Sequence, residues 1–133
     1  MRIAHLLAGL TLAAAPGLAH AADPWDGGDP VAGKAIFTSG HGGLPCAVCH
    51  YAEAGKNKIG PTLWGVVGRP SATVASFTYS DAMKAYNHVW TPQNLFVYLE
   101  APMKVVPGTK MTFPGLPSET DRKNVIAYLA TLK

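Results

Sequence analysis

The chain has 133 residues, of which 48% are hydrophobic and only 14% are charged, and its formal net charge at pH 7 is +3. A hydrophobic fraction near one half argues against intrinsic disorder, and the length fits one small domain. The basic side chains are few and scattered, whereas a nucleic-acid partner requires a clustered basic face. We therefore expect no nucleic-acid binding.

Residues 1–21 have the pattern of a secretory signal peptide. Arg2 is followed by an apolar run and then by small residues around a cleavage site after Ala21. A retained membrane anchor is the alternative, but the run breaks at Pro16-Gly17, short of the roughly 20 apolar residues that a spanning helix needs. The sequence therefore predicts removal of residues 1–21, export to the periplasm and no stable membrane insertion afterwards.

Residues 22–29 are polar and rich in turn formers, so we expect a flexible lead-in to a domain over residues 30–133. Asp29 suits a helix cap and Pro30 the first helical position, so a helix is predicted to begin here. It should end before the glycine-rich stretch that precedes the first cysteine. Residues 51–75 are interrupted by glycine and proline and predict an irregular loop.

Further helix starts follow in the second half. Ser80 can cap a short helix over residues 81–86, and Thr91-Pro92 begins a helix that ends at Pro102. Residues 102–117 predict a stiff loop, and a capping-box pattern from Ser118 begins the last helix. The predicted fold class is all-α, with three main helices and long ordered loops. Helices this short cannot easily bury enough surface alone, so something else should fill the centre.

Both cysteines fall in the sequence Cys46-Ala-Val-Cys49-His50. Cys-x-x-Cys-His is the signature of covalent c-type haem attachment. Two thiols three residues apart in a helical turn can both reach one porphyrin edge, and the next residue can present its imidazole to the iron. The sequence thus predicts Cys46 and Cys49 as haem thioethers and His50 as an iron ligand, with the cofactor supplying the missing core.

Three other interpretations of the motif are less well supported. A redox-active dithiol belongs at a helix start within a βαβ unit, and no such pattern exists here. A zinc site needs four ligands, and the spacing of His41, His50 and His88 matches no zinc pattern. A structural disulfide would close a very small loop and stabilise little.

The sixth position of the iron has several candidate ligands. Met111 lies in a loop stiffened by Pro107-Gly108 and by Pro114, which suits rigid presentation of a thioether. A methionine is nevertheless more often a core residue than a ligand. The other candidates are Met83, Met103, His41 and His88.

Several further motifs accompany the cysteines, in the order Gly60-Pro61, Gly68-Arg69, Pro107-Gly-Thr-Lys-Met111 and Ile126-Ala-Tyr-Leu129. Together with the cysteine motif they resemble class I cytochrome c, most of all the mitochondrial form and its bacterial relatives. The resemblance covers nearly all of the chain after the signal peptide, from about residue 28 to residue 132. It implies the class I cytochrome c fold, wrapped around one covalently bound haem c.

The resemblance also implies roles for individual residues. Met111 would be the sixth ligand, and the Pro61 carbonyl would accept the His50 imidazole N–H, which fixes the orientation of that ring. Gly33 and Phe37 of the first helix would meet Tyr128 and Leu129 of the last. The remaining implied haem contacts are Arg69, Tyr79 and Trp90 at the propionates, Tyr98 and Thr109 beside the methionine, and Phe113 at the exposed edge.

The chain departs from the family pattern in three respects. About five extra residues lie between Phe37 and Cys46, and Met83 stands where the family usually has an asparagine. Lysines around the haem edge are few, so electrostatic steering towards an acidic partner should be weaker than in the family. The lysines that could contribute are Lys56, Lys58, Lys84, Lys104 and Lys110.

These observations predict a soluble, monomeric, periplasmic one-electron carrier and not an enzyme. Electrons would pass at the exposed edge near Ala47, Val48 and Phe113, to or from a cytochrome complex, an oxidase, a photosynthetic reaction centre or a dehydrogenase. His/Met ligation favours a relatively high potential. One alternative is a peroxidase or gas sensor with an open sixth position, and another is a haem-free zinc or dithiol module.

Overall fold

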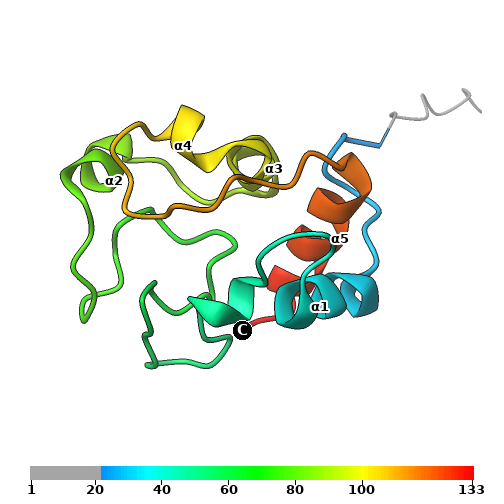
Figure 1. Ribbon diagram of the computed structural model, residues 1–133, viewed down its shortest axis with the longest axis horizontal. Coiled ribbons are helices and arrows are strands. Elements are labelled where there is room, and N and C mark those ends of the chain that lie inside the picture. The colour runs from blue at the N-terminus through cyan, green and yellow to red at the C-terminus, as the bar shows by residue number, and fades with distance from the viewer. Residues whose placement is uncertain (1–21) are drawn as a thin grey trace, which may run out of the picture.

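The computed structural model describes residues 22–133, and the predicted signal peptide lies outside the described residues. All regular structure in this part of the chain is helical, apart from a single β-bridge between Pro70 and Val89. The all-α prediction is confirmed, with α1, α3 and α5 as the main helices (Figure 1). The elements are α1 (Pro30–Ser39), the 3-10 turn η1 (Cys46–Val48), α2 (Asp81–Tyr86), α3 (Pro92–Glu100), α4 (Pro102–Val105) and α5 (Glu119–Leu129).

Side-chain caps fix the predicted helix starts. Asp29 accepts a hydrogen bond from the Val31 amide at 2.8 Å, and Pro30 follows it at the first helical position. Because the first amides of a helix have no partner within the helix, a capping oxygen determines where the helix begins. Three other helix starts are capped in the same way, by Ser80 before α2, Thr91 before α3 and Ser118 before α5.

The predicted loop from Pro102 to Pro117 begins instead with the one-turn helix α4. A proline cannot continue the helix before it, yet its fixed φ suits the first position of the next helix. Pro102 holds that position and is buried, and its carbonyl accepts a hydrogen bond from the Val106 amide at 2.9 Å. The loop prediction for residues 102–117 rests on the first of these two properties, whereas the structure shows the second, and α4 is the difference.

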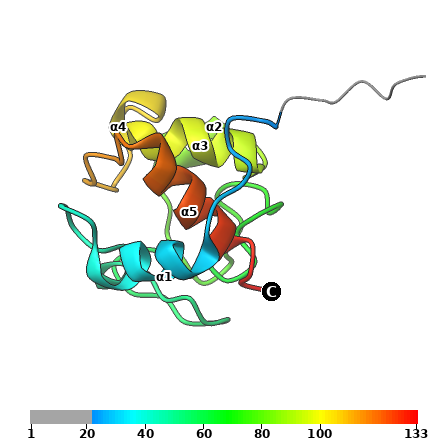
Figure 2. The same cartoon turned by 90° about the vertical axis from the view of Figure 1, so that its right-hand side faces the viewer.

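The first and last helices pack closely against each other (Figure 2). A Cβ atom on Gly33 would overlap the Asn124 carbonyl and would lie 2.9 Å from the Tyr128 Cβ. Glycine is therefore required where α1 meets α5. Beside it, the rings of Phe37 and Tyr128 stand with their centroids 5.3 Å apart. The predicted contact between these helices is confirmed.

Contacts with α5 also hold the segments on either side of α1. The Asp29 amide donates to the Asn124 side chain at 2.8 Å, and Trp25 packs against the hydrophobic core. After α1, the extra residues form a loop that turns at Gly40, where φ is +73°. His41 Nδ1 in this loop lies 2.8 Å from Asp121 Oδ2 at the start of α5. Among residues 22–133, no helix combines the length and the apolar character needed to cross a membrane.

Candidate haem site

A single cavity brings together all the residues predicted to contact the cofactor. Its walls are largely apolar and come from η1, the loops before α2 and after α4, and helices α1, α3 and α5. Several of the wall residues, such as Leu95, Leu99 and Leu129, also belong to the hydrophobic core. The predicted residues that line the cavity are Cys46, Cys49, His50, Pro61, Arg69, Tyr79, Trp90, Tyr98, Thr109, Met111 and Phe113.

The cysteine motif forms a compact turn at one side of this cavity. The Cys46 carbonyl accepts hydrogen bonds from the Cys49 amide at 3.1 Å and the His50 amide at 2.9 Å. This geometry closes the turn, so all three side chains line the same cavity. No disulfide joins Cys46 and Cys49, and both side chains are half-buried. The turn thus offers two thiols and one imidazole to one ligand.

The His50 ring is fixed by Gly60 and Pro61, which lie at the end of the loop that follows His50. His50 Nδ1 donates to the Pro61 carbonyl at 2.7 Å. Because a carbonyl oxygen only accepts, the ring proton sits on Nδ1, and the Nε2 lone pair is left for a metal. Burial lowers the pKa of His50, which favours the neutral form that ligates metals. The ring also packs against Gly60, where a Cβ would come within 2.7 Å of Nδ1.

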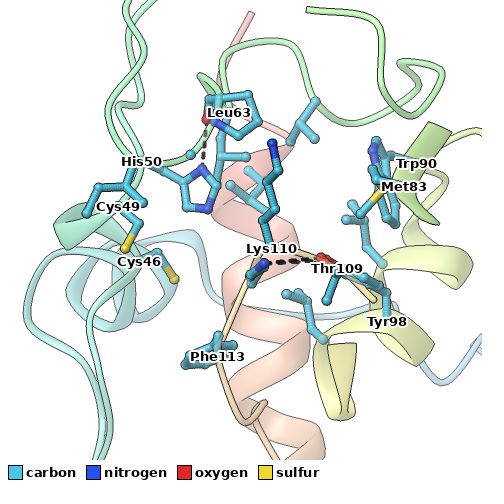
Figure 3. A pocket seen from close by; sticks show the side chains of 18 of the residues that line it. Cys46, Cys49, His50, Leu63, Met83, Trp90, Tyr98, Thr109, Lys110 and Phe113 are labelled. Carbon is cyan, nitrogen blue, oxygen red and sulfur yellow. Dashed lines mark hydrogen bonds between the residues drawn. The ribbon is translucent and has the colours of Figure 1, made fainter. Parts of the chain in front are cut away.

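Met111 is held by two groups at the other side of the cavity. Its amide donates to Thr109 Oγ1 at 3.2 Å, and the Tyr98 hydroxyl donates to its sulfur at 3.3 Å. Figure 3 shows Thr109 and Tyr98 across the pocket from His50. Burial raises the pKa of Tyr98 to about 12, so its hydroxyl keeps the proton that it donates. The methionine sulfur therefore has a fixed direction.

The other candidates for the sixth ligand differ in position. His41 is bound to Asp121, and the exposed His88 makes a hydrogen bond from Nδ1 to the Tyr86 carbonyl. Met103 is exposed and does not line the cavity. Met83 does line it, and lies near Trp90 (Figure 3). Met83 is thus the one rival that shares the cavity with Met111 in the described part of the chain.

Arg69, Tyr79 and Trp90 bring polar donors to the apolar wall. The Arg69 guanidinium donates to the Trp64 carbonyl at 2.8 Å and to the Thr62 carbonyl at 3.0 Å. These bonds use two of its five N–H groups. Burial lowers the pKa of Arg69, although a guanidinium stays charged at any physiological pH. A buried carboxylate on a ligand would need donors of this kind.

The haem-free alternatives fit this geometry poorly. A redox dithiol needs a lowered thiol pKa, whereas burial raises the pKa of Cys46 to about 11. Within residues 22–133, no three His, Cys, Asp or Glu side chains gather in a way that could hold a zinc ion. By contrast, two thiols, an imidazole nitrogen and a thioether around an apolar cavity form the donor set of a covalently bound haem with His/Met ligands. The residues present therefore fit that cofactor.

Several residues that shape the cavity have no role predicted from the sequence. Gly60 makes room for the His50 ring, and Leu63, Leu95 and Leu99 form apolar walls. The Gly60-Pro61 pair marks a special backbone position, but the close approach of the imidazole is a tertiary contact with no local signal. In the sequence, these leucines cannot be distinguished from ordinary core residues of a helix or loop.

Comparison with known proteins gives a consistent result. A family model described as cytochrome c matches residues 30–133. Cytochrome c2 of Rhodopila globiformis is 49% identical over 106 residues, which cover 80% of this chain and 95% of that protein. Cytochrome cy of Rhodobacter capsulatus is 53% identical over 107 residues, which cover 79% of this chain and 50% of that protein. The structure of cytochrome cH from Methylobacterium extorquens matches with a TM-score of 0.70 and 41% identity, over 78% of this chain and 99% of that one.

The helical fold and the donor set of the cavity define a c-type haem protein. With the family match over residues 30–133 and relatives near 50% identity, the chain belongs to the cytochrome c family. Its cofactor is one covalently attached haem c, with Cys46 and Cys49 in the attachment motif. It is an electron carrier and not an enzyme.

Proposed function

We propose that the protein is a soluble, monomeric one-electron carrier of the periplasm, in which His50 and Met111 are both axial ligands of the haem iron. The observation that carries the proposal is that each of these side chains is already fixed by its own protein contacts at the two sides of one cavity. Bound haem supplies an iron that alternates between the ferric and ferrous states. With both ligands retained, no substrate binds the metal.

The chain's own residues would then adjust the site. The Pro61 carbonyl orients the His50 ring, and the Tyr98 hydroxyl orients the Met111 sulfur. Arg69, Tyr79 and Trp90 would donate to the haem propionates. Apolar walls exclude water, which with His/Met ligation favours a relatively high potential.

Loss of the sulfur ligand tests the axial assignment. Met111→Ala is expected to abolish the sulfur-to-iron charge-transfer band of the ferric protein, because among the described methionines Met111 is the one that Tyr98 and Thr109 hold. Met83→Ala and Met103→Ala serve as matched controls and should keep the band. Visible spectroscopy of the purified ferric proteins gives the readout. A band that survives Met111→Ala, or that is missing from the wild type, would contradict the proposal and favour an open sixth position.

The rim of the cavity is a candidate docking surface for redox partners. Leu44 and Ile59 line the cavity and are exposed, at 52% and 78%, and Val48 on the cysteine turn is exposed at 50%. Two of the lysines that could steer an acidic partner interact with the protein itself: Lys84 lies 3.6 Å from Asp81, and Lys110 donates to the Thr78 carbonyl. We infer that the partner is an oxidase, cytochrome complex, reaction centre or dehydrogenase that recognises an apolar rim.

Kinetics with a purified cytochrome oxidase can test this docking surface. The electron-transfer rate should change less than about threefold between low and physiological salt, because steering by charge is weak. Ile59→Lys should slow the reaction by placing a charge in the apolar contact. Val31→Lys is the matched control, because Val31 is also 78% exposed but lies on α1 away from the rim. A faster reaction of Ile59→Lys at low salt would instead indicate an acidic partner surface.

The proposed location depends on the first 21 residues. Their basic start, apolar run and small-residue cleavage site support export and removal of the segment. Cleavage after Ala21 would leave a mature chain of residues 22–133.

A further inference from the structure

Lys58 binds back onto the cysteine turn. Its ammonium donates to the Ala47 carbonyl at 2.5 Å and lies 4.4 Å from the centroid of the Tyr51 ring. Ala47 stands between the two cysteines in η1. Although Lys58 is an exposed residue of the loop after His50, its charged end is thus held by a carbonyl and an aromatic face.

Backbone hydrogen bonds join the same loop to the same turn. The Gly60 amide donates to the Cys49 carbonyl at 2.8 Å, and the Lys58 amide donates to the Gly60 carbonyl at 3.0 Å. The loop is therefore attached to the turn at two points, one through the backbone and one through the Lys58 side chain. Two attachments resist rotation of the turn better than one.

The contacts of Lys58 set it apart from the other nearby lysine. Lys56 lies 5.9 Å from the Tyr51 ring centroid, and no hydrogen bond of its ammonium to the turn is present in the described residues. A lysine free to move in water has its charge screened by salt and solvent. A lysine bound to the Ala47 carbonyl keeps its charge at one place, on the backbone of the turn that leads to His50.

We propose that Lys58 is a positioning residue that locks the Cys46–His50 turn and holds a fixed positive charge at the Ala47 carbonyl, between the two cysteines that would attach the haem, which raises the reduction potential. This inference rests on the proposed electron-carrier function with His50 and Met111 as ligands. A positive charge favours the reduced state, because reduction adds one negative charge to the site.

The test uses redox titration and hydrogen exchange of the holoprotein. Lys58→Met keeps the length of the side chain but removes both charge and donor. It should shift the equilibrium with a reference couple about threefold towards the oxidised protein, and it should speed exchange of the Gly60 amide. Lys58→Arg keeps charge and donor and should restore both properties. Lys56→Met removes an equal charge and should give a smaller shift with unchanged exchange.

The outcomes separate this inference from the function on which it rests. Equal shifts for Lys58→Met and Lys56→Met, or a failure of Lys58→Arg to restore the potential, would overturn the role of Lys58. Unchanged exchange at Gly60 in Lys58→Met would overturn the locking of the turn. The charge-transfer band of the wild type tests the axial ligands independently, because it depends on Met111 and not on Lys58.

Discussion

Haem-free Cys46→Ala/Cys49→Ala protein is expected to be largely unfolded. Core side chains such as Trp90, Leu95 and Leu99 line the cavity and, without haem, would face a void or water instead of a ligand. When an apolar cavity is empty, the protein loses the free energy gained by burying apolar surface, and the side chains that line the cavity lose packing contacts. The three main helices are too short to replace what is lost.

Far-ultraviolet circular dichroism and the dispersion of amide signals in an NMR spectrum measure this effect. Wild-type holoprotein at the same pH and concentration provides the folded reference. Some helical signal could persist, because α1 and α5 contact each other directly through Gly33 and Tyr128. A well-dispersed native spectrum of the haem-free variant would show that the polypeptide core is sufficient alone.

Gly60→Ala is expected to disrupt the His50 side of the site. The added methyl group would come within 2.7 Å of His50 Nδ1, so the ring must move away from the Pro61 carbonyl or the loop must shift. Overpacking of this kind costs about 1–3 kcal/mol of stability. Displacement of the ring also weakens the bond that orients it. We therefore expect a lower free energy of unfolding together with an altered visible spectrum.

Gly43→Ala is the matched control for this substitution. A Cβ at Gly43 meets no atom within 4 Å, and neither Gly43 nor Gly60 has a positive φ. The two variants thus make the same chemical change on unstrained backbones, and only Gly60 faces an imidazole. Denaturant titration and the ferric spectrum should both be close to wild type for Gly43→Ala. If Gly60→Ala behaves like this control, the His50 ring is not confined as the structure indicates.

The local features of the fold could be predicted from the sequence, since caps and prolines act within a few residues. Asp29, Thr91 and Ser118 each determine a helix start by bonding an amide two or three residues later. The motif around Cys46 is equally local. The one-turn helix α4 was missed because Pro102 can both end and begin a helix, and only the burial of that proline shows which occurs.

Contacts between distant segments could not be predicted from local pattern alone. The resemblance to cytochrome c, not spacing, indicated Tyr98 and Arg69 as site residues. Nothing in the sequence indicated that His41 would reach Asp121, or that Lys58 would bind the Ala47 carbonyl. Each of these contacts depends on how a loop packs against a segment that is distant in sequence. The proposed haem ligands are predicted by motif and by resemblance, whereas the contacts that hold their side chains are found only in the geometry.

The contact of α1 with α5 has a consequence for the order of events during maturation. Gly33 and Asn124 are in contact although most of the chain lies between them in sequence. This contact therefore cannot form until the C-terminal end of the chain is present. In the proposed export, which begins at the N-terminus, Cys46 and Cys49 would emerge long before α5 does. Their thiols are then exposed, whereas burial in the closed fold raises the pKa of Cys46 to about 11 and suppresses its thiolate. Thioether formation is therefore chemically easiest on the open, still-emerging chain, before the last helix closes the molecule.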